Sequence, residues 1–380
     1  MANDVLTPDA PLSQEFREAV SDAILSFLEE QAGVLDSMGP ELAPVHLMAS
    51  QLLGGGGKRM RPSFCVWSYV ATSGMPAPED MRTLLSAAAS LELLHASALI
   101  HDDVMDSSDL RRGRPAAHRQ FEALHANAGW LGDSAAFGRA GAILLGDLLL
   151  MWSVQMLQGS GLDESALQRA LPIVEAMRTE VTCGQYLDIV AQAHPLRQRA
   201  PAVGSILPNI EVAIDDASRV VEYKAARYTV QRPCQIGAAL GGGDDKVYFA
   251  LAAYGSPLGR AFQFRDDLLG VFGDTKLTGK PAGDDLREGK RTVLVAHAFA
   301  HASEAGRALL MRRLGDSTLD AEGVAALQQV LEESGARHAV EAKIAEGYER
   351  AMLALTDVDI SDEGRLALTA LADAAVRRDY

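Results

Sequence analysis

The stretch LLSAAASLELLHASALIHDDVMD, Leu84–Asp106, is an apolar run that ends in three carboxylates. Its apolar residues recur at helical spacing, so we predict a helix over roughly residues 78–106. Glu92 and His95 interrupt the run and acidic residues end it, which argues against a membrane span. We therefore interpret the stretch as a buried helix of a globular protein that carries charge at one end.

Helical periodicity dominates the rest of the chain as well, and alternating β-branched strands with hairpin turns are almost absent. The other stretches with apolar residues three and four positions apart are roughly 15–36, 134–158, 164–190, 215–240 and 245–272, with several more from 290 to 378. No low-complexity linker or fixed-period repeat divides the chain. We predict one all-α domain over residues 14–380, a single large helical bundle, after a flexible N-terminus at 1–13.

Composition excludes several classes of protein. The 380 residues are 48% hydrophobic, which suits a large buried core, and the net charge of -16 argues against a nucleic-acid-binding surface. Anionic substrates stay open, because cations can be concentrated locally. The three cysteines are far apart and suit reduced core residues. The N-terminus has no basic segment followed by an apolar run, so we expect a cytoplasmic protein.

Asp102, Asp103 and Asp106 lie within five residues and precede Arg111 and Arg112. On a helix the first and third of these carboxylates share one face. Two carboxylates ~6 Å apart repel by roughly 3 kcal/mol at an effective dielectric constant of 20. Either an arginine folds back as an ion pair or a divalent cation neutralises the cluster, and the cluster alone leaves both open.

A second acidic pair, Asp266 and Asp267, ends another apolar helical run in FQFRDDLLGVFGD. One acidic helix end is most often a solvated one, but two such ends are harder to explain that way. Neither is accompanied by cysteine or histidine ligands at metal-binding spacing. Carboxylate oxygens alone suit Mg²⁺, which keeps waters and bridges carboxylates to substrate phosphate.

Basic residues gather in glycine-rich turns. GGGGKRMRP (54–62) is not a nucleotide-binding P-loop, because Leu52 and Arg59 stand where that motif needs glycine and serine or threonine. The turn places Lys58, Arg59 and Arg61 at a helix start, where an anion is favoured, although a solvated basic turn also fits. A second loop, GKPAGDDLREGKRT (279–292), carries two more lysines. Together these groups suit two diphosphates, with the carboxylates holding metal between them.

The motifs GGKRMRP, HDDVMD followed by RRGRP, GQYLD, YKAARY, FQFRDDLLGVFGD and GKPAGDDLREGK stand in this order between about residues 40 and 300. This combination resembles the trans-isoprenyl diphosphate synthase (polyprenyl synthetase) family. The resemblance implies a helical bundle of the isoprenoid synthase type around a deep central cavity. It also implies a Mg²⁺-dependent homodimeric prenyltransferase that joins an allylic diphosphate to isopentenyl diphosphate, without nucleic acid or a membrane span.

The resemblance also assigns roles to single residues. Asp102, Asp106 and Asp266 match the Mg²⁺ ligands, with three ions expected when substrate is bound, and Asp103 and Asp267 are their partners. The matches to the isopentenyl diphosphate site are Lys58, Arg61, His95 and Arg112. The matches to the allylic diphosphate site are Arg111, Lys224, Lys280 and Lys290, with Gln185, Asp188 and Gln263 nearby. Lys224 joins the five aspartates as a catalytic candidate, and the departing diphosphate is the expected proton acceptor.

Chain length is predicted from the helix that carries Asp102. In the family, an aromatic residue four or five positions before that aspartate closes the tunnel at fifteen carbons. Ser97 and Ala98 stand there, so we expect a deeper floor, at Leu94 or Leu93, and a geranylgeranyl product. One helical turn, ~5 Å, is about one isoprene unit. The alternative is that these small residues only allow close helix packing.

The family's second acidic motif usually ends in a third aspartate, where this chain has Gly270. If the missing carboxylate weakens metal binding, Gly270→Asp should lower the Mg²⁺ requirement. Asp274, one turn further on, is a possible substitute. The other functions considered are a non-catalytic partner subunit of a prenyl diphosphate synthase and a terpene cyclase of the same fold, which has no use for a second diphosphate site.

Overall fold

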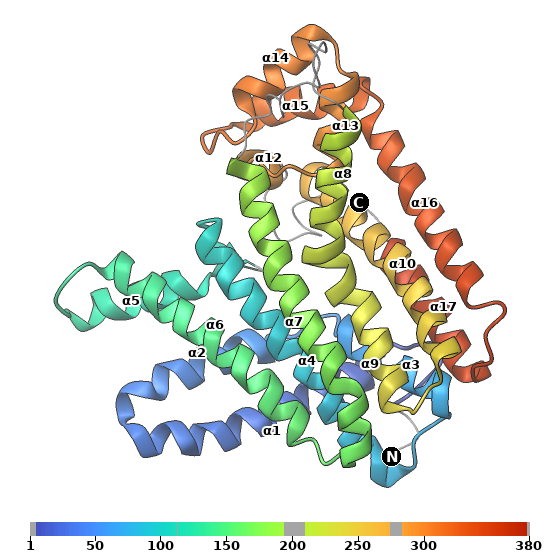
Figure 1. Cartoon of the computed structure of the whole chain (residues 1–380). Coiled ribbons are helices and arrows are strands. Elements are labelled where there is room, and N and C mark those ends of the chain that lie inside the picture. Colours follow the sequence, from blue (N-terminus) through green and yellow to red (C-terminus); the bar gives the residue numbers. More distant parts are fainter. Residues whose placement is uncertain (1–4, 112, 194–209, 274–282, 378–380) are drawn as a thin grey trace. The chain divides into compact units, whose positions relative to one another are not determined.

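The computed structural model of the chain describes residues 5–111, 113–193, 210–273 and 283–377. Helices dominate this part of the chain, and the strands assigned in it, β1 (Leu110–Arg111) and β2 (Arg114–Pro115), form one antiparallel hairpin (Figure 1). The all-α prediction is therefore confirmed. The structure does not test the prediction of a flexible segment at 1–13.

The helices, in chain order, are α1 (Gln14–Met38), η2 (Pro40–Leu42), α2 (Ala43–Gly54), α3 (Met60–Ser73), α4 (Pro78–Met105), α5 (Ala117–Ala128), α6 (Ser134–Gln158), α7 (Glu164–Ala193), α8 (Ile210–Val220), η3 (Val221–Gln231), α9 (Arg232–Leu240), α10 (Asp245–Phe272), α12 (Asp284–Glu288), α13 (Val293–His301), α14 (Glu304–Arg313), α15 (Ala321–Glu333), α16 (Ala336–Ala354) and α17 (Asp362–Val376). The observed bounds of α4, α6 and α10 lie within about one residue of the predicted ranges.

Contacts divide the chain into two compact units. The first unit is Met1–Arg178, Arg232–Ala252 and Asp357–Leu371, and the second is Thr179–Gln231, Ala253–Thr356 and Ala372–Tyr380. The first acidic motif (Asp102, Asp103 and Asp106) and the loop at 54–62 lie in the first unit. The second acidic motif, which begins with Asp266 and Asp267, lies in the second unit. The prediction of one domain over residues 14–380 stays a prediction.

Helix α4 is the centre of the first unit and packs against α6, α3 and α1. Both α4 and α6 are long and apolar enough to cross a membrane by length and composition alone. In α4, 72% of the most apolar window is buried inside the protein, as in the core helix of a globular fold, whereas in α6 the buried share is 44%. Helix α4 therefore matches the buried helix expected from its sequence, and α6 leaves an apolar face exposed.

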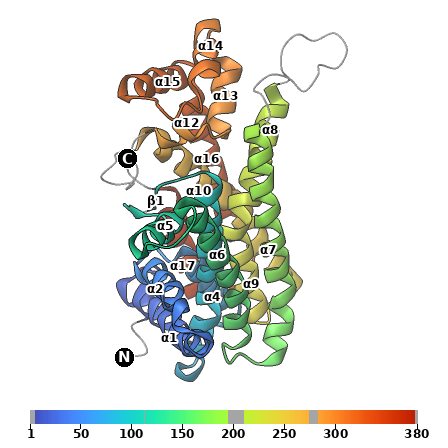
Figure 2. The ribbon, with the colours of Figure 1, turned by 90° about the vertical axis from the view of Figure 1, so that its left-hand side faces the viewer.

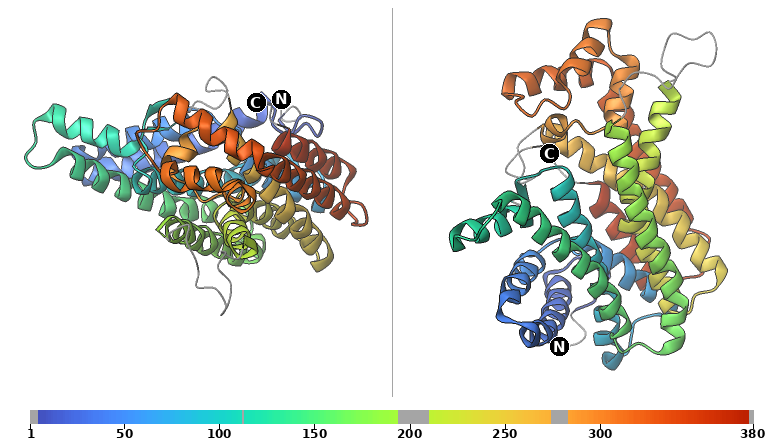
Figure 3. Two further views of the ribbon diagram at one scale, coloured as in Figure 1. Left: turned by 90° about the horizontal axis from the view of Figure 1, so that it is seen from above. Right: turned by 60° about the vertical axis from the view of Figure 1, so that its left-hand side comes forward.

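The ends of the helices follow local sequence signals. The Ser13 side chain accepts a hydrogen bond from the backbone N–H of Phe16 at the start of α1, and Asp133 caps α6 in the same way through Ala135. Helix α4 starts at Pro78, which needs no backbone donor in the first turn. Helices α1 and α2 then form a hairpin (Figure 3).

In the second unit, α8 continues directly into η3, a π-helix, rather than into further α-helix. The sequence predicts one helix over 215–240, and the structure divides this stretch into α8, η3 and α9. Helix α13 packs against α8 and α16, while α14 and α15 pack together beside it (Figure 2). π-Helical segments often mark functional sites, because the extra residue per turn re-aims side chains.

Candidate functional site

The first acidic motif lies at the C-terminal end of α4. Asp102 and Asp103 are in the last turn, and Asp106 follows the helix as its C-cap, with its backbone N–H donating to the Asp102 carbonyl at 2.8 Å. A helix C-terminus carries partial negative charge, so three carboxylates there repel one another and the helix dipole. This end of α4 therefore needs positive charge from elsewhere.

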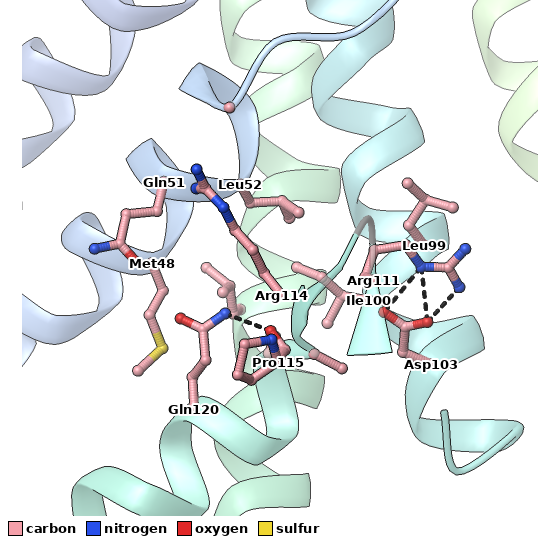
Figure 4. Close-up of a pocket in the computed structure, with 14 residues that line it drawn as sticks. Met48, Gln51, Leu52, Leu99, Ile100, Asp103, Arg111, Arg114, Pro115 and Gln120 are labelled. Atoms are coloured by element: carbon pink, nitrogen blue, oxygen red, sulfur yellow. Dashed lines mark hydrogen bonds and ion pairs between the residues drawn. The ribbon is translucent and has the colours of Figure 1, made fainter. Parts of the chain in front are cut away.

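Arg111 supplies part of that charge. The β1–β2 hairpin turns the chain back, and the Arg111 Nε donates to both carboxylate oxygens of Asp103, at 2.9 and 3.2 Å (Figure 4). Its Nη2 lies 3.7 Å from Asp102 Oδ2. Asp103 is buried, only 3% exposed, whereas Asp102 and Asp106 are half-buried. Of the two ways to neutralise the aspartates that the sequence left open, the ion pair with an arginine is therefore the one that the structure shows for Asp103.

A pocket in the first unit opens beside this ion pair. Leu99 and Ile100 of α4 form an apolar wall, and Arg111 and Arg114 of the hairpin bring positive charge to the rim (Figure 4). The hairpin is held there by Gln120 of α5, whose side-chain amide donates to the Pro115 carbonyl at 2.8 Å. The lining thus combines apolar surface with two guanidinium groups.

The three basic residues of the glycine-rich loop before α3 differ in how far they are exposed and in what they contact. Lys58 is exposed and Arg61 is buried within the first turn of α3. Arg59 between them has φ +50, is 4% exposed, and donates through Nη1 to Glu92 Oε2 at 2.9 Å. It also donates to Ser21 Oγ at 3.1 Å. Arg59 therefore anchors the loop to α4 and α1.

Sequence reasoning missed the role of Arg59, although the sequence carried a signal for it. Glu92 is an acidic residue inside an otherwise apolar helix, and a buried carboxylate needs a cationic partner. The partner is the middle basic residue of the loop, held in a backbone conformation that non-glycine residues seldom adopt.

Three positions predicted to set chain length are placed on α4. Leu94, Ala98 and Asp102 lie on successive turns and so share one face of the helix. Leu94 and Ser97 are each 3% exposed, while Ala98 and His95 are half-buried. The small residues Ser97 and Ala98 therefore lie between the acidic end of α4 and the larger Leu94.

In the second unit, Lys224 and Asp188 form an ion pair, with Nζ 2.6 Å from Oδ2. Gly184 makes this possible, because a Cβ at that position would lie 2.3 Å from the backbone nitrogen of Lys224. The glycine of GQYLD thus lets α7 and the π-helix η3 approach closely, and Gln185 beside it is half-buried. Two residues predicted from separate motifs are brought together here.

The second acidic motif lies in the last two turns of α10. Asp266 is half-buried, whereas Asp267 is 5% exposed and accepts one hydrogen bond at Oδ1 from the Gln263 amide, at 2.8 Å. Among the described residues its Oδ2 has no hydrogen-bond partner. Burial, and then the neighbouring charges of Asp285 and Asp266, raise the pKa of Asp267 to about 8. The Gln263 hydrogen bond acts in the opposite direction.

Lys290 lies near the same motif in the second unit. Its Nζ lies 3.4 Å from Asp285 Oδ1 and 2.7 Å from Glu288 Oε2. Both of these carboxylates belong to α12. Three further candidate site residues predicted from the sequence lie outside the described residues: Arg112, Asp274 and Lys280.

The residues proposed to hold Mg²⁺ are Asp102 and Asp106 of the first unit and Asp266 of the second. Within the described ranges there is no group of three or more histidine, cysteine, aspartate or glutamate side chains arranged to hold a metal ion by itself. A donor set of half-buried carboxylates without nitrogen or sulfur fits Mg²⁺, which completes its shell with waters and phosphate oxygens. The chemistry of the donors therefore fits this ion.

Comparisons with known proteins place the chain among related sequences. A family model described as Polyprenyl synthetase matches residues 43–333. Geranylfarnesyl diphosphate synthase of Natronomonas pharaonis is 30% identical over 381 residues, covering 95% of this chain and 99% of that protein. The (2E,6E)-farnesyl diphosphate synthase of Mycobacterium bovis is 30% identical over 354 residues, covering 90% and 88%.

The chain is also similar to a solved structure of a prenyl diphosphate synthase. Geranylgeranyl pyrophosphate synthase from Corynebacterium glutamicum, complexed with isoprenyl diphosphate and magnesium, is 40% identical to this chain. The alignment covers 98% of this chain and 100% of that one, with a TM-score of 0.88. The names of these relatives imply three different chain lengths, so the likeness does not choose one product.

Proposed function

The chain belongs to the polyprenyl synthetase family and is an enzyme of the trans-prenyltransferase type, and from this premise we propose its reaction. It condenses an allylic diphosphate with isopentenyl diphosphate, in the presence of Mg²⁺, to a longer trans-prenyl diphosphate. The observation that carries this is the end of α4, where Arg111 neutralises the buried Asp103 and leaves Asp102 and Asp106 half-buried beside it.

The reaction breaks one C–O bond, forms one C–C bond and releases one proton. The allylic C1–O bond breaks, the carbocation is attacked by the double bond of isopentenyl diphosphate, and the departing diphosphate takes the proton. Mg²⁺, when bound, stabilises charge on that leaving group. Asp102, Asp106 and Asp266 would hold it, while Lys224 and Lys290 would donate to the diphosphate oxygens.

For the second substrate we propose the basic loop before α3. Lys58 and Arg61 would bind isopentenyl diphosphate, with His95 of α4 and Arg112 as further contacts. Arg59 fixes the loop through its ion pair with Glu92, so the cations on either side of it keep their spacing. A terpene cyclase needs no such second diphosphate site, which is why the transferase is preferred.

The product we propose is geranylgeranyl diphosphate, and the small residues on α4 support it. Ala98 stands one turn below Asp102, and the first large side chain on that face is the buried Leu94. A chain that passes Ala98 is one isoprene unit longer than one stopped there, because a helical turn and an isoprene unit are each about 5 Å.

We further propose a homodimer, supported by the exposed face of α6. Phe137, Leu144 and Met151 are spaced seven residues apart and are 36%, 67% and 61% exposed, with Ile143 at 44% beside them. An apolar helix face of this kind is typical of an interface. Sedimentation of the wild type and of Leu144→Glu tests it, and a monomeric wild type would exclude the dimer. A cytoplasmic location stays a prediction.

The reaction is tested by product chromatography. Purified protein is incubated with isopentenyl diphosphate, Mg²⁺ and dimethylallyl, geranyl or farnesyl diphosphate in separate reactions, with a sample containing EDTA as control. We expect elongation that stops at twenty carbons and is abolished by EDTA. Folded protein that elongates none of the three primers would support the alternative of a non-catalytic partner subunit.

A further inference from the structure

Gly270 stands at the fifth position of the second acidic motif, four residues after Asp266 and in the last turn of α10. It is absent from the glycines with positive φ, so its backbone conformation is open to other residues. The reason for a glycine must therefore lie in the space beside its Cα.

That space is filled by another carboxylate. A Cβ at position 270 would lie 2.1 Å from Asp285 Oδ2 and 2.6 Å from Asp285 Cγ. Real Cβ atoms do not approach other heavy atoms so closely, so any larger residue at 270 must displace Asp285. The carboxylate next to the last turn of α10 thus comes from α12 instead of from α10 itself.

Contacts within the second unit hold α12 beside the end of α10, and one of them reaches the Asp285 side chain. The Gly283 N–H donates to the Gly270 carbonyl at 3.2 Å, and the Lys290 N–H donates to the Asp285 carbonyl at 3.0 Å. Lys290 Nζ lies 3.4 Å from Asp285 Oδ1. A side chain added at 270 would therefore have to displace the Asp285 carboxylate and its contact with Lys290.

A second observation is a buried carboxyl group beside Asp285 whose hydrogen bonding is incomplete. Asp267 is only 5% exposed, and within the described residues no group donates a hydrogen bond to its Oδ2. Asp285 is close enough to act on the charge of Asp267. A buried carboxylate oxygen without a donor is costly unless a ligand completes it.

We propose that Asp285 replaces the third aspartate of the second acidic motif, and that position 270 is glycine because the two carboxylates exclude each other. This inference rests on the proposed function, since it assigns Asp285 to the binding of the metal–diphosphate group. It reverses the expectation from sequence alone, because Gly270→Asp now has to damage the site that it was expected to improve.

The test compares Gly270→Asp, Asp285→Ala, the double variant Gly270→Asp/Asp285→Ala, and Asp285→Asn, which keeps the size and removes the charge. Asp284→Asn is the matched control, because it changes the neighbouring carboxylate of α12. Two quantities are measured for each protein: Tm without metal, and the Mg²⁺ concentration that gives half of the Tm increase in the presence of inorganic diphosphate. Neither readout requires turnover.

We expect Gly270→Asp to lower Tm by about 2–4 °C or more through overpacking. Asp285→Asn should raise the Mg²⁺ requirement by about 10- to 100-fold with little change in Tm. The double variant should recover both quantities to near wild type, and Asp284→Asn should change neither.

Three results would overturn the exchange of carboxylates: an unchanged Tm for Gly270→Asp, an unchanged Mg²⁺ requirement for Asp285→Asn, or a double variant no better than Asp285→Ala. Failure of the proposed function is distinguishable, since it appears as absent elongation by the wild type in the product assay.

Discussion

The two acidic motifs both begin with a pair of aspartates, but they treat the buried member differently. In the first unit, Asp103 receives the Arg111 guanidinium on both oxygens. In the second, Asp267 receives one hydrogen bond from Gln263, and burial raises the pKa of Asp267 to about 8. The third carboxylate also differs, being Asp106 of the same segment in the first motif and, as proposed, Asp285 of α12 in the second.

The difference shows two ways to build an acidic site. The planar guanidinium of Arg111 fixes both oxygens of Asp103, so the chain itself neutralises the charge at the end of α4. The Gln263 amide gives Asp267 a single neutral donor, so the end of α10 depends more on what binds there. We infer that the first motif is assembled in advance and that the second requires a ligand to complete it.

The largest expected effect comes from the half-buried aspartates that open each motif. Asp102→Ala and Asp266→Ala should each lower turnover by about 10²- to 10³-fold, because each removes an oxygen that we propose holds the metal on the leaving group. Steady-state assays measure this, with circular dichroism as a check of folding and Asp109→Ala as a control outside both motifs. Near-wild-type turnover of Asp266→Ala would contradict a role of the second motif in catalysis and would leave such a role to the first motif alone.

The middle aspartates sharpen the comparison through stability. Asp103→Asn should lower the free energy of unfolding by about 2–3 kcal/mol, because it breaks the buried ion pair in which Arg111 donates to both oxygens of Asp103. Asp267→Asn removes no ion pair and should cost less than about 1 kcal/mol. Urea unfolding of the metal-free proteins gives both values. Equal losses would contradict the idea that only the first motif is assembled in advance.

The cations of the two units give a smaller, more selective effect. Lys58→Ala and Arg61→Ala should raise the KM for isopentenyl diphosphate by about tenfold, the equivalent of ~1.4 kcal/mol. Lys224→Ala, which also removes the ion pair with Asp188, should raise the KM for the allylic primer instead. Initial rates with each substrate varied in turn separate these effects. Similar changes in both KM values for all three variants would contradict the assignment of separate diphosphate sites.

The smallest expected effect on rate concerns product length. One turn before its acidic motif, α4 carries Ala98 and α10 carries Phe262. If the growing chain follows α4, Ala98→Phe should shorten the product from twenty to fifteen carbons with turnover within a few-fold of wild type. Phe262→Ala is the matched control on α10 and should leave the length unchanged. Chromatography of dephosphorylated products decides, and a wild type that stops at fifteen carbons would exclude the channel along α4.

The helical fold and the position of the charged motifs could be predicted from sequence because both are local properties. The spacing of apolar residues predicts α4 and α10, and acidic residues at their ends are visible without any tertiary contact. The family resemblance supplied the roles of Asp102 and Asp266. Confirmation of the family extends this to the class of reaction, while the role of each residue stays a prediction.

The remaining features depend on contacts between distant residues. Arg59 and Arg61 look alike in the loop, and only the buried Glu92, 33 residues away from Arg59, distinguishes them. The π-helix η3 could not be told from α-helix by periodicity, since an insertion of this kind shifts the pattern only slightly. Gly270 reads as a lost ligand until Asp285 is found beside it.

The central claim is that both acidic motifs hold the metal ions of one allylic diphosphate. It is tested most directly by counting bound Mn²⁺ by electron paramagnetic resonance, with an unreactive thiolo analogue of farnesyl diphosphate, in the wild type, Asp102→Ala and Asp266→Ala. We predict that the wild type binds Mn²⁺ tightly only with the analogue present, and that either substitution alone removes most of this binding. A variant of either motif that binds as many ions as the wild type, with equal affinity, would contradict the claim.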